Sequence, residues 1–132
     1  MRVTLSNFIN PKQLWVIREL ERGEEGAYFS ALMGKMADHI SKMPVTYATE
    51  GQGNSALAQL HYFIGDCDWW IIEKDCEEEQ LQAYGYACLG DPAYAEYGYI
   101  SIPELLGAGA ELDLHWEPIP MGEVKVAMGI KW

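Results

Sequence analysis

The sequence predicts an α+β fold in which an N-terminal αα-hairpin packs on a mainly antiparallel β-sheet, with one or two short helices toward the C-terminus. Apolar residues recur at helical spacing up to Pro44, whereas from residue 45 they gather in short segments rich in aromatic and β-branched residues. With 132 residues, 49% of them hydrophobic, the chain suits one compact domain with one core. We therefore expect a single domain, with a helical lead-in over residues 1–44 and a sheet-containing region over residues 45–132.

Two helices are expected before residue 45. Asn10 is a good N-cap, Pro11 suits the first helical position, and Gln13 can complete a capping box. The first helix should therefore begin there and end near Gly23. The second helix follows a short GEEG turn and ends at Pro44. Its apolar residues recur at helical spacing: Phe29, Leu32, Met33, Met36 and Ile40.

Short aromatic segments follow the helices. Three of them are predicted to form successive antiparallel strands: ALAQLHYFIG, DWWIIEKD and LQAYGYACLG. LDLHWEP, residues 112–118, is expected to form a further strand. Between these, Ser101 and Glu104 form a capping-box pattern that starts a short helix, which should end near Gly107 or Gly109. The final segment, MGEVKVAMGIKW, is expected to be a short helix or an irregular tail.

The negative charge of the chain is concentrated in its second part. Residues 1–44 hold six Lys and Arg against five Asp and Glu, and residues 45–132 hold three against fifteen, so the formal charges are +1 and −12. Such a surface repels phosphate backbones, which disfavours direct binding of nucleic acid. It would attract basic partners, including proteins that themselves hold DNA or RNA. The alternative is that the acidity serves solubility only.

Residues 65–80, GDCDWWIIEKDCEEEQ, concentrate seven carboxylates around two adjacent tryptophans. Strand alternation places Trp69, Ile71 and Glu73 on one face and Trp70 on the other. One tryptophan should enter the core, while the other is either covered by another element or left as a contact surface. The acidic residues after the strand fall in a turn that points side chains outward. The candidates for partner binding are Glu77, Glu78, Glu79, Asp75 and Trp70.

No metal site or cofactor is expected from this acidic segment. Outward-pointing carboxylates do not converge on one ion, and the D-x-D-x-D-G pattern of a calcium loop is absent. Cys67 and Cys76 lie at opposite ends of the predicted strand, so they are expected to be reduced thiols, and Cys88 is expected in the core. The longest apolar runs are far shorter than the roughly 20 residues of a membrane-spanning helix, and no secretory signal is recognisable. We therefore expect a cytoplasmic protein with no membrane partner.

Two other segments carry candidate catalytic residues. Asp113, His115 and Glu117, at i, i+2 and i+4 of the predicted LDLHWEP strand, would project from one face. An imidazole between two carboxylates suits a divalent metal or a histidine base, whereas the alternative is the solvent-facing side of an edge strand. Glu50 lies in the loop TYATEGQGNSA, whose glycines can bring backbone amides near a ligand or can simply form an ordered turn. The candidates for catalysis are therefore Asp113, His115 and Glu50.

The order of four segments resembles a known family. YATEGQG, HYFIGDCDWWIIEKD, AYGYACLGDPAYAEYGYISIPEL and ELDLHWEPIPMGEV together are similar to domain of unknown function 2958, a family of small proteins of plasmids, integrative elements and phages. The resemblance covers about residues 44–125. The chain departs from the family pattern in the acidic turn at residues 77–79 and in DPAY at residues 91–94. The resemblance implies a location on mobile DNA, but it brings no established activity, cofactor or catalytic residue.

Three functions are compatible with these observations. The leading hypothesis is a non-enzymatic binding protein of a mobile genetic element, whose acidic surface occupies a basic host or element-encoded protein, such as a nuclease or nucleoprotein complex, and so counters or modulates host defence. Mimicry of DNA charge would be one route. The second hypothesis is a small metal-dependent or hydrolytic enzyme centred on Asp113 and His115. The third is an assembly module of the element's own machinery. The oligomeric state stays open.

Overall fold

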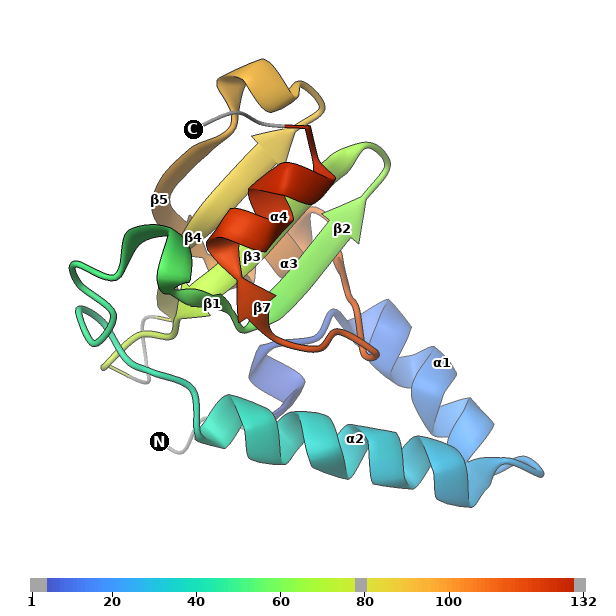
Figure 1. The fold of residues 1–132 in the computed structure, drawn as a ribbon. Coiled ribbons are helices and arrows are strands. Elements are labelled where there is room, and N and C mark those ends of the chain that lie inside the picture. Colours follow the sequence, from blue (N-terminus) through green and yellow to red (C-terminus); the bar gives the residue numbers. More distant parts are fainter. Residues whose placement is uncertain (1–4, 78–80, 130–132) are drawn as a thin grey trace.

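The computed structural model describes residues 5–77 and 81–129, and it has a mixed α+β architecture as predicted (Figure 1). The α-helices are α1 (Pro11–Glu21), α2 (Gly26–Ser41), α3 (Ile102–Gly107) and α4 (Met121–Ala127). The strands are β1 (Leu57–Ala58), β2 (Leu60–Ile64), β3 (Cys67–Glu73), β4 (Gln82–Leu89), β5 (Glu96–Ser101), β6 (Glu111–Leu112) and β7 (Ile119–Pro120). Three 3₁₀ turns complete the described elements: η1 (Leu5–Asn7), η2 (Gly53–Ser55) and η3 (Pro92–Tyr94).

The main sheet has five antiparallel strands in the order β5-β4-β3-β2-β6, and β1 and β7 form a separate antiparallel pair. The three predicted strands are confirmed as β2, β3 and β4, although the first predicted segment is divided into β1 and β2 at Gln59. β5 was not predicted. It lies at the sheet edge and pairs with β4 over its whole length.

The capping residues that begin the helices act largely as the sequence predicts. The Asn10 side chain accepts a hydrogen bond from the Gln13 amide at 2.8 Å, and the Ser101 side chain accepts one from the Glu104 amide. The Gln13 side chain, however, exchanges two hydrogen bonds with the backbone of Leu112, at 2.7 and 2.8 Å. Gln13 thus fastens the start of α1 to β6, a different role from the capping box that we expected.

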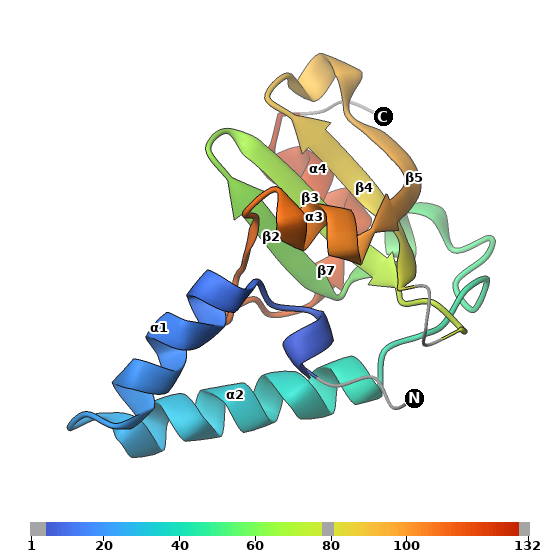
Figure 2. The ribbon, with the colours of Figure 1, turned by 180° about the vertical axis from the view of Figure 1, so that it is seen from behind.

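The sheet is covered on both faces (Figures 1 and 2). Figure 1 shows α4 across one face, and the reverse view in Figure 2 shows α3 across the other, with α1 and α2 beyond the lower edge. On the α3 face, Met36 and Ile40 of α2 and Met43 just after the helix join sheet residues in one hydrophobic cluster. On the α4 face, Met121 and Val124 join a second cluster. The two clusters use opposite sides of the same strands.

Strand β3 supplies large side chains to both clusters, as its alternation predicts. Trp69 packs against the α3-side cluster, and Trp70 lies in the α4-side cluster with 5% of its surface exposed. Trp70 was expected on a partner-binding surface, but α4-side residues cover it, so that expectation is wrong. Of the two alternatives for the second tryptophan, the covered position is the one observed.

A β-bulge at Ile72 interrupts the alternation of β3. Ile71 opposes Gly85 and Glu73 opposes Tyr84, so Ile72 is an additional residue without its own partner on β4. A bulge of this kind turns the following side chain to the other face of the sheet. Glu73 therefore shares the α4 face with Ile72, and the prediction that it would lie with Trp69 and Ile71 is wrong.

The close pairing of β3 and β4 beside the bulge depends on a glycine. A Cβ atom on Gly85 would lie 2.1 Å from the Trp70 carbonyl oxygen, a distance at which backbone atoms must move apart. Gly85 thus permits the strands to approach at the point where β3 bulges.

The segment LDLHWEP is not the strand that we predicted. β6 ends at Leu112, and the next residue begins a turn in which the His115 amide donates to the Asp113 side chain at 3.1 Å. The Trp116 indole donates to the Ala58 carbonyl oxygen at 2.8 Å, which holds the segment against β1. The final segment begins with helix α4 (Met121–Ala127), the first of the two possibilities expected for it, and a turn follows up to residue 129, where the described residues end.

The structure describes the surroundings of the cysteines and the lengths of the helices. Cys88 is buried, with 4% of its surface exposed, and all three cysteines are free thiols. No helix in the described ranges is long and apolar enough to span a bilayer.

Candidate functional site: a tyrosine-lined cavity

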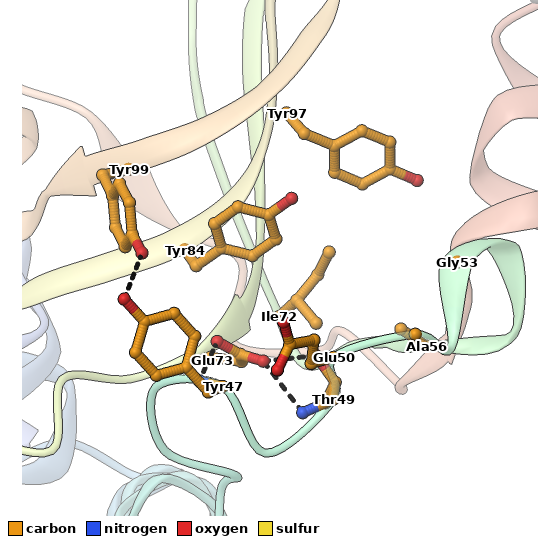
Figure 3. Close-up of a pocket in the computed structure, with 11 residues that line it drawn as sticks. Tyr47, Thr49, Glu50, Gly53, Ala56, Ile72, Glu73, Tyr84, Tyr97 and Tyr99 are labelled. Carbon is orange, nitrogen blue, oxygen red and sulfur yellow. Dashed lines mark hydrogen bonds between the residues drawn. The ribbon is translucent and has the colours of Figure 1, made fainter.

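A cavity of about 320 Å³ opens beside the bulge of β3, between the sheet and the loop that joins α2 to β1 (Figure 3). Its lining comes from three strands and this loop: Tyr47, Thr49, Glu50, Gly51, Gly53, Ala56, Ile72, Glu73, Tyr84, Tyr97 and Tyr99. Four of these residues are tyrosines and two are glutamates. This volume lies at the lower end of the range for ligand pockets.

Glu73 is the central polar residue of the cavity, and only 4% of its surface is exposed. One carboxylate oxygen accepts from the Tyr47 amide at 2.9 Å, and the other accepts from the Thr49 amide at 2.9 Å and from the Thr49 hydroxyl at 2.5 Å. All three donors come from the loop. Glu73 therefore holds the loop against the sheet, and backbone amides in this loop bind an internal carboxylate.

The loop adopts a conformation that this anchoring stabilises. Tyr47 has a φ angle of +70°, in the left-handed region that a bulky residue rarely adopts. Holding a residue there has an energetic cost, which surrounding contacts must offset. The hydrogen bond from the Tyr47 amide to Glu73 is one such contact. The strained residue also carries an aromatic ring that is 68% exposed at the mouth of the cavity.

The tyrosines of β4 and β5 face each other through strand pairing. Tyr84 opposes Tyr99 and Tyr86 opposes Tyr97 in the register, with Gly85 opposite Gly98 between them. The Tyr84 ring lies edge-on to Tyr99, with centroids 5.7 Å apart, and is stacked with Tyr97 at 6.2 Å. Figure 3 shows the resulting row of rings on the sheet side of the cavity, with Tyr47 on the loop side.

The cavity environment disfavours negative charge on the tyrosines. The pKa of Tyr84 is raised above its ordinary value, first by burial and then by the nearby Tyr97 and Glu73. The pKa of Tyr99 is raised, first by its hydrogen bond to the Tyr47 hydroxyl at 3.5 Å, then by desolvation and by neighbours that include Glu73. Both rings therefore stay neutral at pH 7 and present electron-rich faces.

A lysine side chain already lies against this aromatic row from the side of α4. The Lys125 ammonium is 4.6 Å from the centroid of the Tyr97 ring and 5.4 Å from that of Tyr86, and it donates to the Asn54 side chain at 2.7 Å. Only 8% of the Lys125 surface is exposed. The hydroxyl of Tyr97 is buried and has no hydrogen-bond partner among the described residues. The aromatic row thus stabilises one internal cation beside the cavity.

The predicted catalytic residues do not converge. Glu50 lines the tyrosine cavity, whereas Asp113 and His115 lie elsewhere. The Asp113 carboxylate is 3.3 Å from Nδ1 of His61, and Nε2 of His115 is 2.7 Å from the Tyr28 hydroxyl. Glu117 pairs with Lys35 at 3.3 Å. The premise that three side chains share one strand face is wrong, because the chain turns at Asp113.

His61, which was not predicted to have a polar partner, lies between two carboxylates. Nε2 of its ring is 2.8 Å from Asp68, on β3, and Nδ1 faces Asp113. The ring stacks on Trp70 with centroids 5.4 Å apart, and Trp116 packs 5.1 Å away. Within residues 5–77 and 81–129, no group of three or more His, Cys, Asp or Glu side chains is arranged to hold a metal ion.

The predicted acidic contact residues are only partly described. Asp75 accepts hydrogen bonds from the amides of Glu77 and Gln82, both at 2.9 Å, so it stabilises the connection between β3 and β4. Glu77 is exposed, and Glu78 and Glu79 lie outside the described residues. The contribution of these residues to partner binding stays a prediction.

Sequence reasoning missed most of the cavity, although one signal for it was present. The tripeptide Tyr-Gly-Tyr occurs twice, at residues 84–86 and 97–99, and alternation places both tyrosines of each copy on one face. Recognising the second copy as a strand would have placed four tyrosines together. Glu73 could not have been placed there, because its position depends on the bulge.

No protein-family model matches the chain, and no curated protein or solved structure is significantly similar to it. The resemblance to domain of unknown function 2958 therefore stays a prediction.

Proposed function

We propose that this chain is a non-enzymatic binding protein that engages a basic protein partner through the surface around the tyrosine-lined cavity. The observation that carries the proposal is the composition of the cavity. Four tyrosines and two glutamates line it, and no Lys, Arg or His is among its described lining residues. Aromatic rings with nearby carboxylates attract cations and disfavour anions.

The surroundings of the cavity favour a protein as the partner. Tyr47 and Tyr99 are 68% and 54% exposed, and tyrosines are enriched where protein interfaces bury their central contacts. The cavity lies in the region of residues 45–132, which carries a formal charge of −12. Long-range attraction by this charge would steer a basic partner toward the face, and short-range contacts with the rings would then hold it.

The wider biological role extends the same proposal. The partner would be a basic protein such as a nuclease or nucleoprotein complex, and this chain would be a factor that counters or modulates host defence. This role fits the acidic charge and the resemblance to proteins of mobile elements. An assembly module would use the same face on a partner encoded by the element itself. The identity of the bound protein distinguishes these two roles.

The enzymatic alternative has less support than the binding function. It was centred on Asp113 and His115, whose side chains contact different partners, and no histidine, cysteine or serine is among the described residues that line the tyrosine cavity. The Thr49 hydroxyl, the one aliphatic hydroxyl among the described lining residues, donates to Glu73 and holds the loop.

Affinity purification with a matched pair of variants tests the proposal. The tagged protein is purified from its natural host with chemical crosslinking, beside a cavity variant carrying Tyr99→Ala and Glu50→Gln. The control carries Tyr94→Ala and Glu24→Gln, which remove the same ring and charge from exposed positions that do not line the cavity. We expect a basic protein that is recovered with wild type and control, at least fivefold less with the cavity variant, and less at high salt. If every captured protein is recovered equally with both variants, the proposal is wrong.

A further inference from the structure

We propose that the cavity seats a single lysine side chain, whose ammonium group is held between the tyrosine rings and the carboxylates of Glu73 and Glu50. This inference rests on the proposed function, because the lysine is supplied by the basic partner. It goes further by naming the group that is recognised and the residues that recognise it.

The first support is the unbalanced charge of Glu73. Its carboxylate is buried and accepts three hydrogen bonds from the loop, which is the pattern of an ionised acceptor. Within the described part of the chain, no ion pair to Glu73 is present. Buried carboxylates in proteins are generally paired with a cation as well as hydrogen-bonded. A cation that enters the cavity would complete this pairing.

The second support is the arrangement of rings around the carboxylate. Tyr84 opposes Glu73 across the strand pair, and its ring lies between those of Tyr97 and Tyr99. In Figure 3 the Tyr47 ring lies on the loop side and its hydroxyl meets that of Tyr99. Rings on several sides of a cation, with a carboxylate at the base, form the kind of aromatic cage that recognises alkylammonium groups.

The third support is that the same aromatic row already binds an ammonium group. Lys125 lies over the Tyr97 and Tyr86 rings from the α4 side, with a neutral amide oxygen from Asn54 as its hydrogen-bond partner. The cavity beyond offers rings of the same type and adds the charge of Glu73, which the Lys125 position lacks. Rings of the type that bind Lys125 thus line the cavity together with a buried carboxylate.

The hydrogen bonding of Glu73 favours lysine over arginine. A guanidinium group binds a carboxylate best through two parallel hydrogen bonds, one to each oxygen. Both oxygens of Glu73 already accept from the loop, and one of them accepts twice. An ammonium group needs only one free acceptor site and completes its contacts with ring faces and with the exposed Glu50.

Blocked tripeptides provide a direct test with the full-length protein. The probes are N-acetyl-Gly-Lys-Gly-amide and its analogues with norleucine or arginine in place of lysine, titrated while backbone amide shifts are followed by NMR. Norleucine keeps the alkyl chain of lysine and removes the charge. We expect saturable, millimolar binding of the lysine peptide, with shifts at Thr49, Glu50, Gly51 and Tyr84. Binding should be at least tenfold weaker for norleucine and weaker for arginine.

Variants locate the binding to the cavity. Tyr99→Ala and Glu50→Gln alter exposed side chains, so we expect both variants to fold, and each should bind the lysine peptide at least threefold more weakly. The Tyr94→Ala and Glu24→Gln control should bind it like wild type. Three results would each overturn the inference. The norleucine peptide could bind as tightly as the lysine peptide, the control variant could lose as much affinity as the cavity variants, or the arginine peptide could bind more tightly than the lysine peptide.

The two proposals fail in different ways. If the host partner is lost from the cavity variant but the lysine peptide does not bind the wild-type protein, the surface binds a protein. The inference that the cavity binds a lysine side chain is then wrong. If n-butylammonium binds in the cavity but the blocked lysine peptide does not, the cavity accepts only small amines. That result also overturns the inference that the cavity binds a lysine side chain of a protein. If the lysine peptide binds but no host protein depends on the cavity for its recovery, the proposed function is wrong. The inference that a protein partner supplies the lysine is then wrong as well.

Discussion

The two ends of strand β3 carry the same kinds of side chain but arrange them differently. At the start of the strand, the carboxylate of Asp68 meets the ring of His61, which stacks on Trp70. At the end of the strand, the carboxylate of Glu73 accepts hydrogen bonds from donors of the loop and faces a cavity lined by tyrosines. Both sites combine carboxylates and aromatic rings on the α4 face of the sheet. The site at the start of β3 contains the His61 imidazole between two carboxylates. At the end of β3, the described partners of the Glu73 carboxylate carry no positive charge.

A structural polar cluster and a candidate binding site differ in whether the charges are satisfied within the protein. Each ring nitrogen of His61 has a carboxylate oxygen within 3.3 Å, and rings cover its faces, so the cluster is complete without any other molecule. The Glu73 site has open volume next to the charge. Residue composition alone would have favoured the histidine cluster as the functional site.

Both ends of β3 depend on its pairing with β4, and Gly85→Ala should disturb them together. The added Cβ would lie 2.1 Å from the Trp70 carbonyl oxygen, so the strands must separate beside the bulge. We expect a loss of about 3 kcal/mol of unfolding free energy, the upper end of the usual range for overpacking in a core. Urea denaturation measures it. Gly98→Ala is the matched control, because a Cβ at Gly98 meets no atom within 4 Å. Equal losses for both variants would contradict this account of the bulge.

Glu73→Gln tests the open site. The substitution replaces one carboxylate oxygen by an NH2 group. Because the loop also presents hydrogen-bond donors to this position, at least one of the three hydrogen bonds is lost and two donors face each other. We expect a loss of about 2–3 kcal/mol, the range for buried hydrogen bonds to a charged group, and faster hydrogen exchange at Thr49. The control is Glu50→Gln, which changes the same charge at an exposed lining residue and should not alter stability measurably.

His61→Ala tests the complete site. The substitution removes a ring that stacks on Trp70 and packs against Trp116, and it leaves two aspartates without their imidazole partner. We expect a loss of about 2 kcal/mol in urea denaturation, while affinity for the lysine tripeptide is unchanged. His115→Ala, which removes an exposed histidine, is the control for stability. A large change of peptide affinity in His61→Ala would remove the distinction between the two sites.

Alkaline pH should affect the core more than either site. Burial strongly raises the pKa of Tyr62, whose hydroxyl donates to the Phe8 carbonyl oxygen in the α3-side cluster. An unfolded tyrosine loses its proton near pH 10, while the folded Tyr62 keeps it, so above that pH the unfolded state binds fewer protons. Unfolding free energy should therefore fall as pH rises above about 10, by up to about 1.4 kcal/mol per pH unit for this group.

Tyr62→Phe provides the comparison for the alkaline effect. The variant should lose about 1–2 kcal/mol at pH 7, because the Phe8 carbonyl oxygen is left without this donor, and its further loss between pH 10 and 11 should be smaller than that of wild type. Urea denaturation at each pH gives both values. A pH dependence that matches wild type would show that Tyr62 is not its source.

Local features of the sequence determined most of the elements of this fold. The caps at Asn10 and Ser101 begin helices where predicted, and alternation in DWWIIEKD places Trp69 and Trp70 in opposite cores. These features depend on hydrogen bonds or periodicities within a few residues, so they can be recognised without knowing the rest of the chain. The excess of negative charge after residue 44 is likewise a property of the sequence alone.

The position of the candidate site depends on contacts between segments that are distant in the chain. The bulge at Ile72 turns Glu73 to the α4 face, the pairing of β4 with β5 brings together tyrosines 13 to 15 residues apart in the chain, and the loop folds onto both. The turn at Asp113 divides the triplet that alternation had placed on one face. Register, bulges and strand ends depend on contacts between distant segments, and one additional residue reverses which face a side chain occupies. For that reason the sequence determined the two-sided sheet, and the tertiary contacts alone determined which carboxylate faces the cavity.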